Sequence, residues 1–372
     1  MRIVVVNQVP SRPLLEVAEA LAHRGHEVTL LAGKSAGTRP TSRVRRVPLA
    51  EYDSRSTFKR VKSWLAFTIQ AAWTLSTMPA PATIVACTNP PLMPFVAGLV
   101  ARIRGADCVA RVLDIYPDVL QATGFRRRKV LAGCLAWCNR RAYARCRAVC
   151  TLGETMAATL AAYVSRSKIR VIPEWPAIQG VVTEAVARSE SGPFVVLTTG
   201  NVGLTHDLGP LISASRSLAG ENVEIIISTG DPAALIDLLS VCKNVRVVPR
   251  FDDAEYARAM LGAHAAFVSL KPGAEAASYP SRVLAYLAHG LPIIAVTSRP
   301  SDLARIVDEG PCGVVVSPHA GGSEVAAAIR MLMAAPDVRQ RLALAAKAAA
   351  AGCAPDRWRD EFVMLIETGL AE

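Results

Sequence analysis

Short apolar runs alternate with helix-period stretches along nearly the whole chain. In the first half these runs lie at residues 2–6, 27–32, 83–87, 107–113 and 147–151. Each run is too short for a helix but long enough for a strand that is buried on both faces. Buried strands separated by helical stretches predict a parallel sheet with helical crossovers.

The same alternation starts again in the second half. Its apolar runs lie at residues 194–199, 223–228, 245–248, 265–270, 292–296 and 313–316. The loop Pro173-Glu174-Trp175-Pro176 and a weakly patterned stretch up to residue 193 separate the two series. The sequence therefore predicts an α/β protein of two Rossmann-like, doubly wound parallel-sheet domains that face each other across a cleft, with residues 1–175 and 193–352 in the two domains.

Length and composition agree with this division. A chain of 372 residues with 51% hydrophobic and 20% charged residues has enough core material for two folded domains. The run Ile3-Val4-Val5-Val6 is too short for a signal peptide, and no apolar stretch has the length of a membrane span. We therefore expect the protein to be cytoplasmic.

The nine cysteines are scattered and lie mostly in apolar surroundings, which favours buried thiols in a reducing compartment. Cys134 and Cys138, and likewise Cys146 and Cys150, are four apart, the spacing that puts two residues on one helix face. No partner set has zinc spacing, so packing is favoured over a metal site.

Positive charge is concentrated in the first half. Residues 1–170 contain 26 Lys or Arg against 9 Asp or Glu, whereas the remainder contains 16 against 22. Basic residues adjoin apolar ones in Phe58–Phe67, which leads toward Trp73, and in Phe125–Lys129, which leads toward Trp137. This combination suits an anionic membrane surface, while core-facing helices with solvated basic ends explain it equally well. Nucleic acid is not expected, since aromatic residues make up only 5% of the chain.

Candidate chemistry lies in loops that follow strands of the second domain. Gly200-Asn201-Val202-Gly203 follows the run 194–199, and a helix is expected to begin near Asp207. Glycines in such a loop let backbone N–H groups approach a phosphate, although a tight turn without a ligand has the same pattern.

A second loop, Lys271–Arg282, adds charge. Lys271 and Arg282 bracket the start of a helix for which Ser281 is the expected N-cap. Two helix N-termini with two cations suit a diphosphate, and Glu275 offers an acceptor for a sugar hydroxyl.

Several short motifs, in this order along the chain, resemble the retaining GT-B glycosyltransferases of family four, bacterial surface-polysaccharide and colanic-acid-type members above all. The motifs are Asn89-Pro90-Pro91-Leu92, Arg111-Val112-Leu113-Asp114-Ile115-Tyr116-Pro117-Asp118, Gly200-Asn201-Val202-Gly203, His206-Asp207, Leu270-Lys271-Pro272-Gly273, Glu275, Pro280-Ser281-Arg282 and His289-Gly290-Leu291-Pro292-Ile293-Ile294-Ala295. The resemblance spans almost the whole chain.

The resemblance implies transfer of a sugar from a nucleoside diphosphate sugar with retention of configuration, without a cofactor or an essential metal. It implies a role in cell-surface polysaccharide or glycolipid biosynthesis, with a lipid-linked molecule as one candidate acceptor. It further implies that residues 353–372 form a helix crossing back to the first domain. The donor would bind on the second domain and the acceptor on the first.

The resemblance also assigns roles to individual residues. Glu275 would meet the donor sugar, and Lys271 and Arg282 would be the cations. Apart from the resemblance, Asp114 is the carboxylate of the first domain best placed to orient an acceptor hydroxyl, although capping a strand end is an equal alternative. The remaining donor contacts would be Gly200, Asn201, Gly203, Ser281, Pro249, Arg250 and Phe251, with the last three lining the base.

The sequence departs from the family pattern at three points. Ala285 replaces a glutamate, the loop after the first strand is shortened to Asn7–Ser11, and the lysine expected after the Gly200 loop is missing, with His206 as its potential substitute. These departures keep two alternatives open: a catalytically silent nucleotide-sugar-binding scaffold and a nucleotide-sugar 2-epimerase.

Overall fold

The structure, a computed structural model, describes residues 1–34, 43–53, 55–123, 129–175, 192–200, 205–233, 235, 242–353 and 355–370. The chain divides into two compact units. The first contains Met1–Trp175, Ala277–Tyr279 and Pro355–Glu372, and the second contains Pro176–Ala276 and Pro280–Ala354.

The first unit is built on a parallel sheet that has seven strands in the described part of the chain, in the order β3-β2-β1-β4-β5-β6-β7. Its strands are β1 (Arg2–Val6), β2 (Glu27–Gly33), β3 (Arg45–Leu49), β4 (Thr83–Cys87), β5 (Asp107–Arg111), β6 (Ala148–Thr151) and β7 (Ile169–Val171). Its α-helices are α1 (Arg12–His23), α2 (Thr57–Thr77), α3 (Met93–Arg104), α4 (Lys129–Arg145), α5 (Glu154–Leu160) and α13 (Pro355–Thr368).

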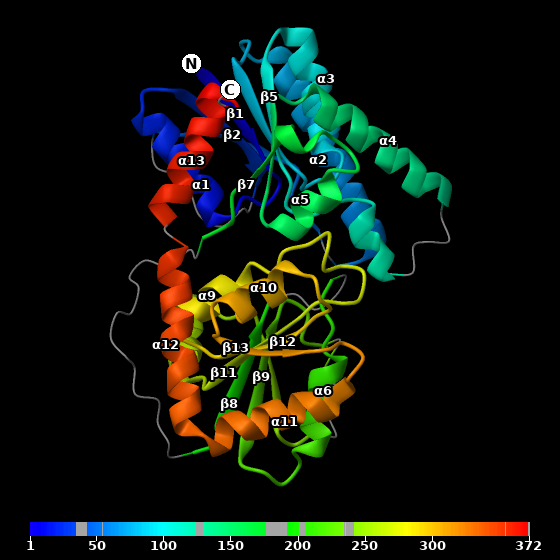
Figure 1. Ribbon diagram of the computed structural model, residues 1–372. Helices are drawn as coiled ribbons and strands as arrows, with labels where there is room; N and C mark the ends of the chain where they lie inside the picture. Colours follow the sequence, from blue (N-terminus) through cyan, green and yellow to red (C-terminus); the bar gives the residue numbers. More distant parts are fainter. Residues whose placement is uncertain are drawn as a thin grey trace. The chain divides into compact units, whose positions relative to one another are not determined.

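Helices cover both faces of this sheet. Figure 1 shows α1 and α13 on one face and α2, α3 and α4 on the other. Ile3 and Val5 alternate with Val4 and Val6 along β1, and all four are fully buried because each face of the strand meets a helical layer. The C-terminal helix α13 contributes Phe362, Val363 and Ile366 to the same hydrophobic cluster as Ile3 and Val5.

The second unit repeats the architecture with a parallel sheet of six described strands in the order β10-β9-β8-β11-β12-β13. Its strands are β8 (Phe194–Thr199), β9 (Val223–Thr229), β10 (Val245–Pro249), β11 (Ala265–Ser269), β12 (Ile293–Val296) and β13 (Gly313–Val316). Its described helices are α6 (Gly209–Ser217), α8 (Asp253–Gly262), α9 (Arg282–Ala288), α10 (Asp302–Glu309), α11 (Gly321–Ala334) and α12 (Pro336–Gly352). Helices α6 and α11 lie together in Figure 1 and bury one core with β8.

These two sheets confirm the predicted fold class of two doubly wound parallel-sheet domains. The predicted apolar runs coincide with strands to within two residues at either end. Strands β3 and β7 were not predicted, because both lie at sheet edges and carry arginines that break the apolar signal. The expectation that Cys146 and Cys150 share a helix face is wrong, since Cys146 follows the end of α4 and Cys150 lies in β6.

Most cysteines of the described chain are buried free thiols, with Cys134 on α4 as the exposed exception. None of the helices in the described ranges is long and apolar enough to cross a membrane.

The contribution of α13 to the first unit can be tested at Phe362. Its ring is 1% exposed and the guanidinium carbon of the buried Arg111 lies 4.9 Å from its centroid. We expect Phe362→Ala to lower the free energy of unfolding of this unit by about 3–5 kcal/mol, because it removes a filled core position. Hydrogen exchange of β1 peptides at increasing urea concentration measures the change. Met364→Ala, at a position 54% exposed on the same helix, is the control, and an equal loss in both variants would contradict the role of the Phe362 ring.

Candidate functional site

The candidate residues of the second unit lie near the point where the strand order of its sheet reverses. Strand β8 lies between β9 and β11, so the chain leaves β8 toward one edge and later leaves β11 toward the other. Loops that diverge in this way leave a crevice at the carboxyl ends of the strands, where doubly wound proteins bind ligands. Gly200 directly follows β8, and Lys271 lies two residues beyond the end of β11.

Arg282 packs against Gly200. Gly200 has φ +99°, and a Cβ atom at this position would lie 3.0 Å from Nη2 and 3.1 Å from Cζ of Arg282. The position therefore requires glycine for its backbone conformation and for the space that the guanidinium group occupies. The structure thus brings together two residues that the sequence assigned to the same donor contact.

Two tyrosines hold this arrangement in place. The Tyr286 hydroxyl is fully buried, accepts a hydrogen bond from the Thr199 backbone N–H at 2.7 Å and lies 2.9 Å from the Thr199 hydroxyl. Tyr256 on α8 also hydrogen-bonds Thr199, and burial raises the pKa of the Tyr256 phenol. These bonds fix α9, and with it Arg282, to the end of the central strand.

His206 is a neutral member of the cluster. Its Nδ1 lies 2.5 Å from the Ser269 carbonyl oxygen, and because a carbonyl only accepts, Nδ1 carries the proton. Burial, followed by the charges of Arg282 and Lys271, lowers the pKa of His206 to about 3. At neutral pH the ring therefore offers an acceptor at Nε2 and cannot supply the positive charge of the missing lysine.

Positive groups converge on this crevice. Burial lowers the pKa of the Arg282 guanidinium. The positive charge of Arg250, which follows β10, lowers it further, so the two arginines lie near each other. The Lys271 backbone N–H donates to the Thr205 carbonyl at 2.8 Å, which draws the start of the second loop to the end of the first. Like charges gathered in a partly buried site repel each other, so an anion bound there would relieve the repulsion.

Glu275 lies in the same loop and is 8% exposed. Its Oε2 atom is buried and has no hydrogen-bond partner within the part of the chain that the structure describes. A buried carboxylate oxygen is costly without a donor, so this atom can accept a hydrogen bond from a group outside the described residues.

The other predicted residues are less closely involved. Ser281 occupies the N-cap position of α9, but its backbone is helical and its hydroxyl makes no capping bond, so the expected cap is absent. Pro249 and Phe251 are tied to β9, since the Ser228 hydroxyl donates to the Pro249 carbonyl and accepts from the Phe251 N–H. Asn201 and Gly203 lie outside the described residues.

Asp114 belongs to the first unit, which also contains the segment Ala277–Tyr279. Asp114 and Ser278 form an isolated antiparallel β-bridge, and the Ile115 N–H donates to the Ala277 carbonyl at 2.9 Å. Burial raises the pKa of Asp114, and a hydrogen bond to Ser278 partly opposes this increase.

Sequence reasoning missed Tyr286, Tyr256 and Ser269. A signal existed for Tyr286 alone, because it is four residues after Arg282 and therefore shares its helix face. Tyr256 and Ser269 reach the cluster only through the packing of α8 and β11 against β8. In the described ranges no group of three or more His, Cys, Asp or Glu side chains is placed to hold a metal ion.

Fold and site together define a two-unit α/β protein whose second unit gathers Arg282, Lys271 and Gly200 near the carboxyl ends of β8 and β11. Residues 10–175 match the sequence profile of the Glycosyl transferase 4-like domain. No curated protein matches the sequence significantly.

Solved structures give the fold its name. The chain is similar to WaaG, a glycosyltransferase involved in lipopolysaccharide biosynthesis (TM-score 0.68, 15% identity, 99% of this chain and 100% of that chain). It is also similar to a glycosyltransferase from Rickettsia africae (0.66, 12%, 99% and 98%) and to Anabaena HepE in complex with UDP (0.67, 15%, 99% and 100%). The fold is that of the GT-B glycosyltransferases, and the domain match supports a transferase.

The neutral state of His206 has a measurable consequence for stability. Its pKa is about 3 in the folded protein against an ordinary value of 6.5, so between these values the unfolded chain binds a proton that the folded protein excludes. Stability should therefore fall as pH falls below 6.5. Between pH 7 and pH 5, the free energy of unfolding of the parent should fall by about 2 kcal/mol more than that of His206→Asn. Asparagine keeps a hydrogen-bond donor near the position of Nδ1.

Equilibrium urea unfolding at the two pH values measures this difference. His319→Asn, which changes an exposed histidine of the same unit, should behave like the parent. Equal pH dependence in parent and His206→Asn would show that His206 is not held neutral by the fold.

Proposed function

We propose that this protein is a retaining glycosyltransferase that moves a sugar from a nucleoside diphosphate sugar to an acceptor, with the donor bound in the crevice of the second unit. The observation that carries the proposal is the contact of Arg282 with Gly200, together with the buried Glu275 carboxylate oxygen that has no partner among the described residues. A nucleoside diphosphate sugar carries phosphates that suit the cations and hydroxyls that suit the carboxylate.

The phosphates are assigned to the cationic part of the crevice. Arg282 presents a planar fork of donors that fits phosphate oxygens, and Lys271 adds a point charge from the same loop. Tyr286 and Thr199 preorganise the guanidinium before the donor arrives, which lowers the entropic cost of binding. Nε2 of the neutral His206 accepts a hydrogen bond, so it would meet a donor hydroxyl rather than a phosphate oxygen.

Glu275 is assigned to the sugar. Its Oε2 can accept a hydrogen bond from a ring hydroxyl, and its burial makes that bond selective because a ligand without the hydroxyl would leave the carboxylate unsatisfied.

Electrostatic stabilisation of the leaving group would drive the reaction. As the bond between the anomeric carbon and the β-phosphate oxygen breaks, negative charge grows on the phosphate, where Arg282 and Lys271 can stabilise it. The acceptor oxygen attacks the same face of the anomeric carbon and its proton passes to the departing phosphate. Configuration is thereby retained without a protein nucleophile, and the two cations supply the charge that a metal supplies in other enzymes.

The first unit is assigned to the acceptor. Asp114 presents a half-buried carboxyl whose pKa is raised by the burial of its surroundings, and such a group can orient an acceptor hydroxyl. The match of residues 10–175 to the Glycosyl transferase 4-like domain and the lipopolysaccharide role of the neighbour WaaG support a place in cell-surface polysaccharide or glycolipid biosynthesis. Ala285 favours a second candidate, a nucleotide-sugar-binding scaffold without turnover, because it lacks the carboxylate of the family pattern.

Arg282→Ala tests the phosphate assignment. Loss of a charge-assisted contact should weaken binding of nucleoside diphosphates by about ten- to a hundredfold. Titration calorimetry with UDP and other nucleoside diphosphates measures the dissociation constants. Arg258→Ala, at an exposed position on α8, is the matched control and should bind like the parent. Unchanged binding in Arg282→Ala would remove the phosphate site from this crevice.

Glu275→Gln tests the sugar assignment and separates the two candidate functions. We expect it to bind the bare diphosphate like the parent and to turn over about a hundredfold more slowly, a loss of about 2.7 kcal/mol of transition-state stabilisation. Mass spectrometry of products from a panel of nucleotide sugars first identifies the donor that the parent uses, and Glu309→Gln, at an exposed carboxylate, is the control. Near-parental turnover in Glu275→Gln would refute the sugar assignment, whereas donor binding without turnover in the parent would favour the scaffold.

A further inference from the structure

Helix α2 has two apolar stripes on opposite faces. Its buried face consists of Ser63, Phe67, Ala71 and Leu75, which pack toward the sheet. Val61, Leu65, Ile69 and Trp73 each precede one of these residues by two positions, which is 200° around the helix. The second stripe therefore points almost directly away from the core.

This outer stripe is exposed to solvent. Val61, Leu65, Ile69 and Trp73 are 52–71% exposed, and Phe58 in the first turn is 78% exposed. An outward helix face is ordinarily polar, because apolar side chains there contribute nothing to the core. A continuous exposed apolar stripe on a folded domain marks a binding surface.

The surface continues over the two neighbouring helices. Helix α3 packs beside both α2 and α4, and Figure 1 shows all three on the same face of the sheet. Ile103 on α3 is 74% exposed, and Val130 and Trp137 on α4 are 83% and 53% exposed. The Phe95 ring of α3 lies 6.1 Å from the Trp137 ring, so apolar groups of α3 and α4 adjoin at this point.

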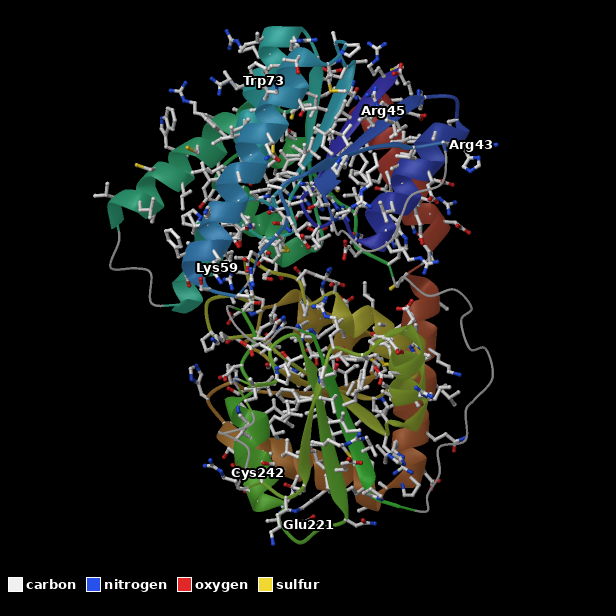
Figure 2. All side chains as sticks on the ribbon, turned by 180° about the vertical axis from the view of Figure 1, so that it is seen from behind. Arg43, Arg45, Lys59, Trp73, Glu221 and Cys242 are labelled. Atoms are coloured by element: carbon white, nitrogen blue, oxygen red, sulfur yellow. The ribbon has the colours of Figure 1, made fainter. Side chains whose placement is uncertain are left out.

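The charge of these helices has one sign. The sequences of α2, α3 and α4 contain nine Lys or Arg residues and neither Asp nor Glu. Lys59 and Lys62 are exposed beside the start of the stripe, and Figure 2 shows Lys59 near one end of α2 and Trp73 nearer the other. Arg102 and Arg140 are exposed on α3 and α4.

We propose that this outer face of α2, α3 and α4, called here the basic apolar face, docks on the surface of a membrane that contains anionic lipids. Its apolar side chains would enter the boundary between headgroups and acyl chains, while the lysines and arginines contact the headgroups. Helix α2, about 30 Å long, would lie in the plane of the surface. This docking would hold whether or not the second unit transfers a sugar.

The charge pattern selects this partner over two others. A second copy of the chain would bring the same cations against each other in a two-fold interface, with no carboxylates on these helices to offset them. Nucleic acid would satisfy the cations through its phosphates but would leave the apolar stripe in water. An anionic lipid surface satisfies both features. The second basic segment of the sequence, Phe125–Arg128, lies outside the described residues, and the inference rests on the three helices alone.

Vesicle binding tests the proposal with the full chain. The parent should sediment with vesicles of phosphatidylcholine and phosphatidylglycerol and much less with phosphatidylcholine alone, and salt should weaken the binding because it screens exposed charges. The triple variant Leu65→Ser/Ile69→Ser/Trp73→Ser, called here the stripe variant, should partition into these vesicles about tenfold less than the parent or weaker still. Lys59→Gln/Lys62→Gln should reduce it about thirtyfold at low salt.

Matched controls separate docking from folding and from donor binding. Arg341→Gln/Leu344→Ser removes an exposed cation and a leucine that is 54% exposed on α12, and it should partition like the parent. All variants should keep the parental melting temperature and parental affinity for UDP, since the changed side chains are outside the core and the crevice. If neither the parent nor any variant bound UDP while the parent still bound vesicles, the result would count against the proposed function and would leave the docking proposal standing.

Trp73 provides a direct readout of insertion. Brominated lipids quench tryptophans that enter the acyl boundary, so quenching should be weaker in Trp73→Phe, which keeps an apolar ring at this position. Equal partitioning of parent and stripe variant, or equal quenching of parent and Trp73→Phe, would overturn the proposal. Concentration-dependent dimerisation that the stripe variant abolishes, without vesicle binding by the parent, would assign the face to self-association instead.

Discussion

The candidate site of the second unit depends on the packing of the Arg282 guanidinium group against the backbone of Gly200, at the end of strand β8. Gly200 supplies the space and the positive φ, and Tyr286 anchors the helix that carries Arg282 to Thr199 of β8. Removing a guanidinium from water is costly, and burial lowers the pKa of Arg282 while the nearby phenols of Tyr286 and Tyr256 oppose that decrease.

Burial and the same positive charges set the state of His206. Burial, followed by the charges of Arg282 and Lys271, lowers its pKa, so it remains a neutral ring hydrogen-bonded to the Ser269 carbonyl at neutral pH. Glu275 is buried in the same loop, and its Oε2 has no hydrogen-bond partner among the described residues. Cationic side chains and a buried acceptor in neighbouring loops are the features on which the proposed donor site rests.

The first unit applies a different constraint to its helices. Helix α13 closes one face of the sheet with Phe362 and Ile366, so this C-terminal segment is part of the core of the first unit. On the opposite face, α2 buries one apolar stripe and exposes another. Packing against the sheet explains the first stripe only, and the proposed docking on a membrane surface accounts for the second.

The sequence by itself determined the fold class, because runs of Val, Ile and Leu between helical stretches have few alternatives to strands buried on both faces. It also selected the loops that follow β8 and β11, since glycine and charge at strand ends are local features. It did not reveal the edge strands β3 and β7, whose short, arginine-containing sequences become strands only because a neighbouring strand offers hydrogen bonds.

Only the tertiary structure decided how the candidate residues act. The sequence suggested His206 as a replacement cation and Ser281 as a helix cap, whereas burial keeps His206 neutral and helical backbone geometry leaves the Ser281 hydroxyl out of any cap. Tyr256 and Ser269 joined the site through contacts between segments far apart in the chain. Charge state and hydrogen bonding depend on which groups surround a side chain, and the order of residues along the chain does not contain that information.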